Sequence, residues 1–334
     1  MKYGIVLGYV SKLNFKETLA SIEEIKDSIF FGLKNDLKLI SVDGGLVTNK
    51  KDWLNDDFQQ TKRPIDFDVI DYKGFGEIII ANNKWRRNLI SKIEHLEHKK
   101  GIISKFSTID RDAKLGNTSS LIYDELGIEI LAKELDHQYL DDFIVKIYKQ
   151  VYETDKKVSS NHKILKSLHF SKTLTFVTYK KLRELYPLLT FKERINKFAK
   201  ENGSFVLKDY VEKIINHKSM NSFSEDVFNF KTFSKLYVYN SECEKAVSIG
   251  YASYQVDREV LREQNLLLKE NYKNNNNYNF LIKSNKLPLT LSAGLFINRI
   301  TMIILEKQHI AEVHSSIWSN EFIEYCNANK IKIF

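Results

Sequence analysis

The fold is decided by one stretch, Leu295-Phe296-Ile297-Asn298-Arg299-Ile300-Thr301-Met302-Ile303-Ile304-Leu305, which is followed by His309-Ile310 and Trp318. Its apolar periodicity predicts a helix over Ile297–Leu305, preceded by a turn at Gly294. Arg299 is the only charged residue on this helix. An arginine there can lie along apolar surface or pair with a carboxylate. Its planar guanidinium can equally hold the phosphate or base of a nucleotide.

Upstream of this stretch, two strands are predicted over Ser234–Tyr239 and Lys245–Val256, joined as an antiparallel hairpin. Alternation along the second strand places small side chains on one face, Ser248, Gly250 and Ala252. The same alternation places on the opposite face the side chains of Val247, Ile249, Tyr251 and Ser253. A face of small side chains permits close approach by a ligand or by another backbone.

The remaining elements follow from periodicity and capping signals. Helices are predicted over Lys16–Leu33, Asp136–Thr154, Thr175–Leu185, a segment between the Thr190–Glu193 capping box and Gly203, a segment capped by Asp257, and Asn320–Ala328. Strands are predicted over Leu37–Val42 and Glu77–Ala81. The polar stretch 153–164 is interpreted as a variable surface loop and as the weakest candidate for a domain boundary, and Asn274–Asn277 as an exposed loop tip. We therefore expect a single domain over residues 1–334.

Composition places the chain among globular proteins. Its 334 residues are 43% hydrophobic and 28% charged, which excludes a disordered or collagen-like chain. No stretch reaches the roughly 20 apolar residues of a membrane span, and the N-terminus lacks a long apolar signal region. Cys243 and Cys326 are the only cysteines and indicate free thiols in a reducing compartment. These features predict a cytoplasmic protein without a membrane segment.

The net charge of +8 comes from lysine, since only nine of the 51 basic residues are arginine. This bias is typical of an AT-rich genome and forms no concentrated basic face that can be read from the sequence. Positive charge nevertheless keeps RNA binding open as a remote alternative. No phosphate-binding loop, paired Cys-x-x-Cys frame or Gly-x-Ser-x-Gly elbow is present. His95-Leu96-Glu97-His98 is interpreted as a solvated helix face, so no metal site is predicted.

The stretch around Arg299 resembles the third signature motif of class II aminoacyl-tRNA synthetases, in the form found in asparagine synthetase A, the aspartate–ammonia ligase family. That family reads Gly-Gly-Gly-Ile-Gly-Gln-Ser-Arg-Leu-Thr-Met, and here Arg299-Ile300-Thr301-Met302 follow the pattern. The segments Leu236–Asn240 and Lys84-Trp85-Arg86-Arg87 also resemble family motifs. The resemblance covers most of the chain. It implies an α/β (α+β) class II synthetase-like fold, with a mixed, mainly antiparallel sheet flanked by helices.

Family members bind aspartate, ATP and magnesium, adenylate the side-chain carboxylate and let ammonia displace AMP. In this chain several positions aligned with their functional residues are replaced. The two magnesium-binding acids align with Lys235 and Ser248, neither of which can take a carboxylate's place on a hard cation. A serine and an arginine that bind substrate and nucleotide align with Tyr251 and Gln255.

Three further positions depart from the family pattern. The aspartate that recognises substrate aligns with Thr48, and a glutamine of the substrate pocket aligns with Glu125. The arginine that grips the α-phosphate aligns with Asp110, although neighbouring Arg111 could serve after a shift of one residue. Losing one transition-state electrostatic donor typically costs about 100- to 1000-fold in rate. Asparagine synthesis by the family mechanism is therefore not expected.

Two main hypotheses follow. The first is a catalytically degenerate family member with a binding or regulatory role and no metal site. The second is an active ATP-dependent amino-acid ligase of altered specificity, with Arg299, Arg111 and Glu125 as catalytic candidates and Thr48, Arg86 and Arg87 as substrate-binding candidates. ATP and magnesium are implied only if the family activity survives. The resemblance also implies a homodimer or a heterodimer with a related synthetase, and an amino acid or nucleotide as ligand.

Overall fold

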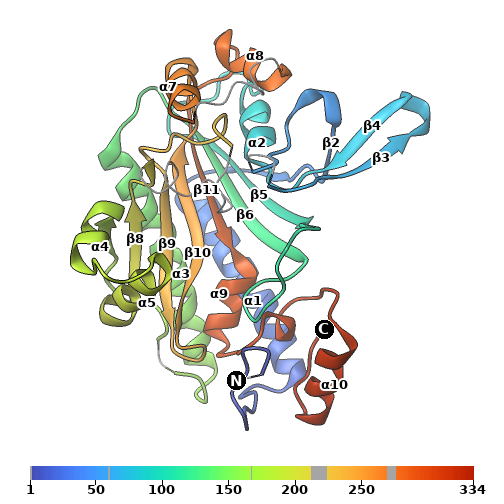
Figure 1. The fold of residues 1–334 in the computed structure, drawn as a ribbon, viewed down its shortest axis with the longest axis vertical. Coiled ribbons are helices and arrows are strands. Elements are labelled where there is room, and N and C mark those ends of the chain that lie inside the picture. The colour runs from blue at the N-terminus through green and yellow to red at the C-terminus, as the bar shows by residue number, and fades with distance from the viewer. Residues whose placement is uncertain (1, 59–60, 167, 212–223, 269–275) are drawn as a thin grey trace.

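A computed structural model describes residues 2–58, 61–166, 168–211, 224–268 and 276–334. Its centre is an eight-stranded sheet with the strand order β1-β5-β6-β11-β10-β9-β8-β7 (Figure 1). The strands are β1 Ile40–Asp43, β5 Gly101–Ile109, β6 Ile122–Leu131, β7 Thr175–Thr178, β8 Ser204–Lys208, β9 Ser234–Asn240, β10 Lys245–Tyr254 and β11 Thr290–Phe296. Only the outermost pairs, β1 with β5 and β7 with β8, run parallel. The predicted mixed, mainly antiparallel sheet is confirmed.

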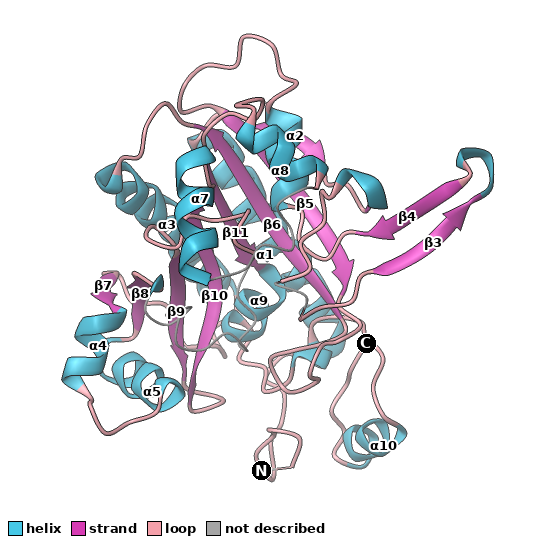
Figure 2. Cartoon of the chain, turned by 45° about the horizontal axis from the view of Figure 1, so that its top comes forward, coloured by secondary structure: helices cyan, strands magenta, loops and turns pink. Residues whose placement is uncertain are grey.

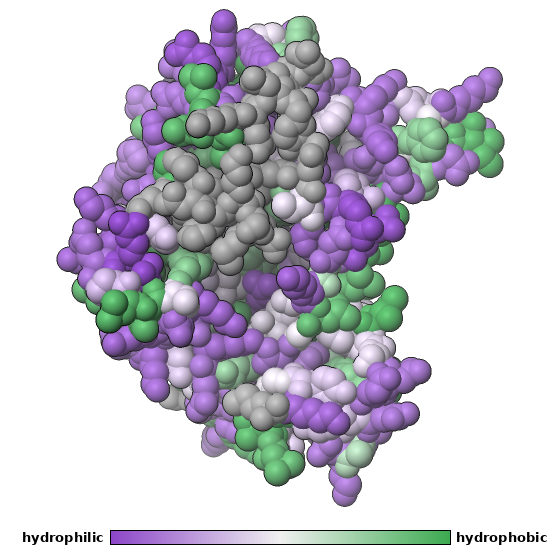
Figure 3. Space-filling view, in the orientation of Figure 1, coloured by the Kyte–Doolittle hydropathy of each residue, from purple (hydrophilic) through white to green (hydrophobic). Residues whose placement is uncertain are grey.

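A second, three-stranded sheet forms an arm that projects from the body (Figures 1 and 2). It contains β2 Val47–Asn49, β3 Ile65–Val69 and β4 Gly74–Ile78, with the short 3-10 helices η1 Lys50–Asp52 and η2 Ile70–Tyr72. Apolar side chains gather at its tip, where Ile70 is 87% exposed and Phe75 is 59% exposed (Figure 3). The predicted strand Glu77–Ala81 thus begins earlier, at Gly74, and ends at Ile78.

One face of the large sheet is covered by three helices, α1 Phe15–Asp36, α3 His137–Asn161 and α9 Ile297–Ile304. Their apolar stripes and the inward side chains of the strands form one continuous core. The Asn14 side chain begins α1 through a capping box with Glu17. The helix predicted around Arg299 is confirmed as α9.

The described elements cover the other face of the sheet only in part. Helix α2 Asn83–Ile90 packs over β5 and β6, and α5 Phe191–Asn202 packs over β8, β9 and β10. The capping box of Thr190 with Glu193 and the positive φ of Gly203 are confirmed as the ends of α5. The other elements are α4 Tyr179–Leu185, α7 Arg258–Leu268, α8 Asn277–Lys283, η3 Ile310–Glu312 and α10 Asn320–Ala328. Within the described ranges, no helix has both the length and the apolar character needed to cross a membrane.

Several local predictions are wrong. Residues 153–161 of the predicted loop 153–164 continue α3, because Asp155, Val158 and Ser159 are buried against neighbouring elements that the sequence pattern did not reveal. The predicted helix Thr175–Leu185 is divided, since Thr175–Thr178 pairs with β8 as an edge strand before α4 begins. Gly294 lies in the middle of β11 and not in a turn.

Two polar segments also differ from prediction. His95 has a positive φ of 56° and lies in a turn, so the predicted solvated helix face is absent there. Within the predicted exposed tip, positions 274 and 275 lie outside the described residues. Asn276 is buried because its side chain accepts a hydrogen bond from the Asn279 backbone and caps α8.

A β-bulge changes the faces predicted for β10. The pairing with β9 shifts between Ser248 and Gly250. Before the bulge Val247 and Ile249 face the core, and after it Ala252 and Tyr254 do. Tyr251 therefore lies on the open face, whereas alternation had placed it on the same face as Ile249. Simple alternation could not anticipate the extra residue.

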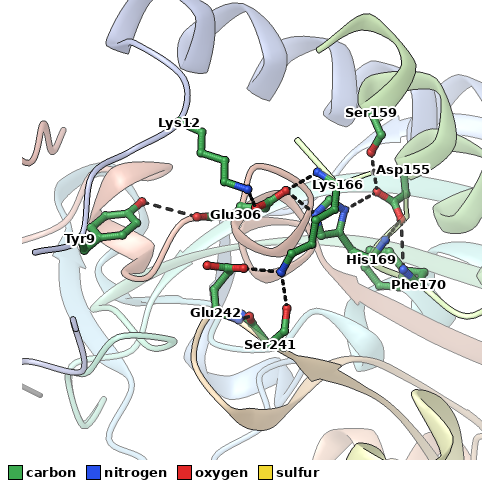
Figure 4. A network of polar contacts seen from close by, with 11 residues as sticks. Tyr9, Lys12, Asp155, Ser159, Lys166, His169, Phe170, Ser241, Glu242 and Glu306 are labelled. Carbon is green, nitrogen blue, oxygen red and sulfur yellow. Dashed lines mark hydrogen bonds and ion pairs between the residues drawn. The ribbon is translucent and has the colours of Figure 1, made fainter. Parts of the chain in front are cut away.

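A buried polar network joins four separate parts of the chain below the sheet (Figure 4). His169 Nδ1 lies 2.8 Å from Asp155, and its Nε2 lies 3.1 Å from Glu306. Glu306 also pairs with Lys12 and accepts a hydrogen bond from the Lys166 backbone. Burial alone would lower the pKa of His169, but the hydrogen bonds to Asp155 and Glu306 and the attraction of these carboxylates outweigh burial and raise it.

This network predicts a pH-dependent contribution of His169 to stability. A histidine with a raised folded pKa stabilises the fold fully below its unfolded pKa of about 6.5, and the contribution disappears as pH rises through the folded pKa. His169→Gln should therefore lower the melting temperature by roughly 3–6 °C at pH 5.5. In thermal unfolding scans, the difference in melting temperature between His169→Gln and the unsubstituted chain should be smaller at pH 8.5 than at pH 5.5. Exposed His137→Gln is the control, and a gap that widens with pH would contradict the prediction.

Candidate functional site

The open face of the sheet holds a cavity of about 800 Å³ between α5, β6, β9, β10 and the first turn of α9. Its walls combine aromatic and charged side chains. The aromatic ones are Phe58, Tyr123, Phe191, Tyr210, Phe228, Phe230, Phe233, Tyr237, Tyr251 and Phe296, and the charged ones are Lys62, Asp110, Asp112, Lys114, Asp124, Glu125, Lys235 and Arg299. A cavity of this size and composition suits a small organic ligand.

The β9–β10 wall of this cavity depends on the bulge. Lys235 and Tyr237 alternate with the core residue Leu236 and therefore face the cavity. Ser248 pairs with Tyr237, and Tyr251 pairs with Lys235 across the strands, so all four belong to one face. The Ser248 hydroxyl is buried without a hydrogen-bond partner among the described residues. Of these four residues, Lys235, Tyr237 and Tyr251 line the cavity, so this wall presents an ammonium and two phenols to it, and no carboxylate.

The floor of the cavity is closed by a buried ionic cluster centred on Arg86. Its Nη1 lies 3.1 Å from Glu125, and its Nε lies 3.4 Å from Glu129. The Tyr251 hydroxyl donates to Glu125 at 2.9 Å, and Gln255 Nε2 donates to Glu129 at 2.7 Å. Burial alone would lower the pKa of Arg86, but Tyr251 and the two carboxylates raise it, so the guanidinium stays charged. Burial raises the pKa of Glu125 and of Glu129, and the attraction of Arg86 offsets this only in part.

Two glycines facing each other across β6 and β11 make room for this cluster. Gly127 pairs with Gly294. A β-carbon at Gly127 would collide with the Arg86 guanidinium, and one at Gly294 would lie 2.6 Å from the Tyr251 ring. The absence of side chains at these two positions therefore lets the arginine and the tyrosine fill the floor from opposite sides.

A second buried layer lies behind the floor. Lys84 Nζ pairs with Asp226 at 2.8 Å and lies over the ring of Tyr278. The Tyr278 hydroxyl donates to the Gln255 side chain, and Arg87 Nε donates to the Pro288 carbonyl. The structure therefore uses Lys84, Arg87 and Gln255 to hold α2 against the sheet and α8, outside the cavity lining.

Arg299 enters the cavity from the first turn of α9. Its Nε donates to the Thr118 carbonyl and its Nη1 to the Ser248 carbonyl, each at 3.0 Å. The guanidinium carbon lies 5.0 Å from the centre of the Phe296 ring. Within the described ranges, Nη2 has no hydrogen-bond partner and no carboxylate forms an ion pair with Arg299. Desolvation lowers the pKa of this half-buried arginine, as expected for a cation without an acidic partner.

The other predicted site residues are divided between the cavity and the surface. Asp110 lines the cavity and is paired with Lys62 at 2.6 Å. Arg111 is exposed and does not line the cavity, so the structure brings Asp110 and not Arg111 to this wall. Thr48 pairs with Glu77 in the projecting arm, away from the lining residues. Of the three catalytic candidates, Arg299 and Glu125 thus share the cavity.

The aromatic lining was missed by sequence reasoning. Phe228, Phe230 and Phe233 precede β9 and all reach the cavity. Three phenylalanines within six residues, outside any regular periodicity, were the available signal. Their side chains could not be assigned to a common wall without the position of β10, because a segment without regular structure has no predictable face.

Comparison with known proteins identifies relatives along the whole chain. A family model described as aspartate–ammonia ligase matches residues 16–330. The aspartate–ammonia ligase of Clostridium tetani is 28% identical over 328 residues, which cover 97% of this chain and 96% of that protein. The corresponding protein of Fusobacterium nucleatum is 29% identical over 330 residues, with 98% of this chain and 100% of that protein covered.

Solved structures with the same fold are class II aminoacyl-tRNA synthetases. The asparaginyl-tRNA synthetase of Pyrococcus horikoshii, complexed with asparaginyl-adenylate, superposes with a TM-score of 0.65 at 10% identity, covering 89% of this chain and 68% of that one. The enzyme of Entamoeba histolytica, also with asparaginyl-adenylate, gives 0.63 at 11% identity, covering 90% of this chain and 66% of that one. The chain thus spans about two thirds of these synthetases, and the likeness establishes the fold.

The ionic cluster predicts that substituting its cation, Arg86, lowers the free energy of unfolding more than substituting one of its acids, Glu125. Arg86→Met leaves Glu125 and Glu129 buried without a cation and should destabilise the fold by about 3–5 kcal/mol in urea unfolding. Glu125→Gln keeps the Arg86–Glu129 pair and an acceptor for Tyr251, so it should cost only about 1 kcal/mol. Arg63→Met removes the exposed pair with Asp112 and serves as the control, with little expected change. Equal losses for Arg86→Met and Glu125→Gln would refute the central role of Arg86.

Proposed function

The chain belongs to the aspartate–ammonia ligase family, and we propose that it uses the family fold to bind a small molecule without acting as a magnesium-dependent ligase. One observation carries this proposal. The wall formed by β9 and β10 turns Lys235, Ser248 and Tyr251 to one face, and none of these side chains offers a carboxylate to a metal ion.

The residues present do not fit the magnesium and ATP that the family implies. Magnesium takes oxygen ligands, chiefly carboxylates together with phosphates and water. The aligned positions hold an amine at Lys235 and an alcohol at Ser248, and the amine repels a divalent cation. The acids in the described lining, Asp110, Asp112, Asp124 and Glu125, are each already paired with a cation. These pairs compete with any metal.

The floor of the cavity supports the same proposal for the amino-acid substrate. A free amino acid needs an anion for its ammonium group and a cation for its carboxylate. Here Glu125 and Arg86 already satisfy each other, and Tyr251 donates to Glu125. Binding aspartate in this place would require separating a buried pair and moving the tyrosine ring away from Gly294. The Arg86–Glu125 pair and Tyr251 therefore occupy the place where an aspartate would bind.

The alternative, an active ligase with altered specificity, is favoured by one observation. Arg299 retains its place in the cavity, with Nη2 directed to no described protein partner. Arginine at such a position can stabilise the charge of a nucleotide. This alternative requires a reaction that needs neither Arg111 nor Thr48, since neither lines the cavity.

We also propose a cytoplasmic dimer, either with a second copy or with a related synthetase. Helix α1 and edge strand β1, which follow one another in the chain, expose large apolar side chains, including Leu19, Phe31 and Ile40. Exposed apolar side chains on adjoining elements are typical of an interface.

Calorimetric titration with ATP tests the proposal against the ligase alternative. ATP affinity should be weaker than 1 mM, on the order of a non-specific contact, and should not improve when magnesium is added. Pyrophosphate exchange with each of the common amino acids should stay at the level without enzyme. The aspartate–ammonia ligase of Clostridium tetani serves as the positive control in both assays. Tight magnesium-dependent ATP binding or amino-acid-dependent exchange would overturn the proposal.

A further inference from the structure

We propose that the cavity binds a planar aromatic carboxylate, with the carboxylate on Arg299 and the ring against the aromatic wall formed by Phe228, Phe233, Tyr251 and Phe296. This inference rests on the proposed function, because it names the class of ligand for the same cavity. It is carried by three features of the described residues: a continuous aromatic wall, a half-buried guanidinium without an acidic partner, and acids that already form ion pairs.

The aromatic wall is continuous. Phe228 lies 5.6 Å from Phe233 and 5.4 Å from Tyr251, measured between ring centres, and Tyr251 lies 5.9 Å from Phe296. Phe233 and Phe296 are only partly buried, so both retain ring surface toward the cavity. Rings at these distances and tilts favour insertion of another flat ring by edge or offset stacking. A flat aromatic group is therefore the apolar part of the ligand.

Arg299 stands at the end of this wall beside Phe296. Two of its nitrogens donate to the Thr118 and Ser248 carbonyls, which fix the guanidinium in place. Carbonyl oxygens orient a guanidinium but do not neutralise it, so its charge stays uncompensated in a poorly solvated position. An anion beside Nη2 would supply that compensation through a charge-assisted hydrogen bond.

The sign of the ligand charge follows from Arg299. Each of the four lining carboxylates forms an ion pair, with Lys62, Arg63, Lys26 and Arg86. Four acids and four basic side chains belong to the described lining, so the lining as a whole does not set the sign of the ligand charge. The sign is set locally by Arg299, which pairs with no acid among the described residues and therefore favours an anion beside it.

The number of charges distinguishes a carboxylate from a phosphorylated ligand. Arg299 offers Nη2 to the ligand, since Nε and Nη1 already donate to carbonyls, and one such donor suits the single charge of a carboxylate. A triphosphate carries several more charges and ordinarily needs a metal ion, which the Lys235 and Ser248 wall does not fit. The cavity of about 800 Å³ leaves room for a ring system of two or more fused rings.

Calorimetric titrations of the full chain with quinoline-2-carboxylate and indole-3-carboxylate test this inference. The neutral quinoline-2-carboxamide should bind about 10- to 100-fold more weakly than the carboxylate, because it cannot form the charge-assisted bond with Arg299. AMP and ATP, each with and without magnesium, are titrated in parallel. Equal binding of the amide and the carboxylate, tighter binding of AMP, or no carboxylate binding would each refute this ligand class.

Substitutions of Arg299 and Phe296 test where the carboxylate and the ring of the ligand bind. Arg299→Gln should weaken quinoline-2-carboxylate binding by about 10- to 100-fold, and Phe296→Leu by roughly 5-fold. Arg194→Gln is the matched control, because Arg194 also donates to two backbone carbonyls, of Tyr186 and Pro187, but lies outside the cavity. Unchanged affinity in Arg299→Gln would refute the assignment. If that variant does not fold, as judged by its melting transition, the amide comparison on the unsubstituted chain decides.

The two proposals fail in different ways. Magnesium-dependent ATP binding with amino-acid-dependent pyrophosphate exchange would overturn the proposed function. Absence of carboxylate binding together with absence of such exchange would overturn only the ligand class and leave the binding function standing. Magnesium-independent binding of AMP in preference to the carboxylates would likewise keep the binding function and replace its ligand.

Discussion

The Arg86 guanidinium, held between Glu125 and Glu129, is the interaction on which the rest of the structure depends. It fastens α2 to β6 and, through Tyr251 and Gln255, to β10. A buried cation of this kind is tolerated only when acids and hydrogen bonds surround it. The space that it needs exists because Gly127 has no side chain. The position of α2 relative to the sheet is thus set by charge pairing in addition to apolar packing.

The same cluster decides what the open face of the sheet can do. Because Arg86, Glu125 and Tyr251 satisfy one another, the charges that an amino-acid ligand would need are already taken, while Arg299 keeps its charge without an acid among the described residues. The cavity is therefore polar and paired at its floor and aromatic and cationic above it. The chain thus shares its fold with its relatives, while its own cavity side chains limit which ligands it can bind.

Predictions from the sequence succeeded where one element determines its own structure. The apolar stripe of α9, the capping box of α5 and the antiparallel hairpin of β9 with β10 depend on nearby residues, and all three are present. Predictions failed where distant partners decide. Residues 153–161 continue the helix because one side of it, with Asp155, Val158 and Ser159, is buried, and Thr175–Thr178 is a strand because β8 lies beside it.

The sequence by itself determined the family, the mixed antiparallel sheet and the identity of the side chains at the aligned site positions, because motif spacing and hydrophobic periodicity are local properties. Only the tertiary structure decided how those side chains are used. The extra residue of the β10 bulge moves Tyr251 to the cavity, and paired glycines in β6 and β11 admit Arg86 and that tyrosine together. The bulge is one extra residue within a hairpin, which simple alternation does not register. The arrangement of Arg86 and Tyr251 depends on contacts between segments more than 100 residues apart, and such contacts leave no periodic signal in the chain.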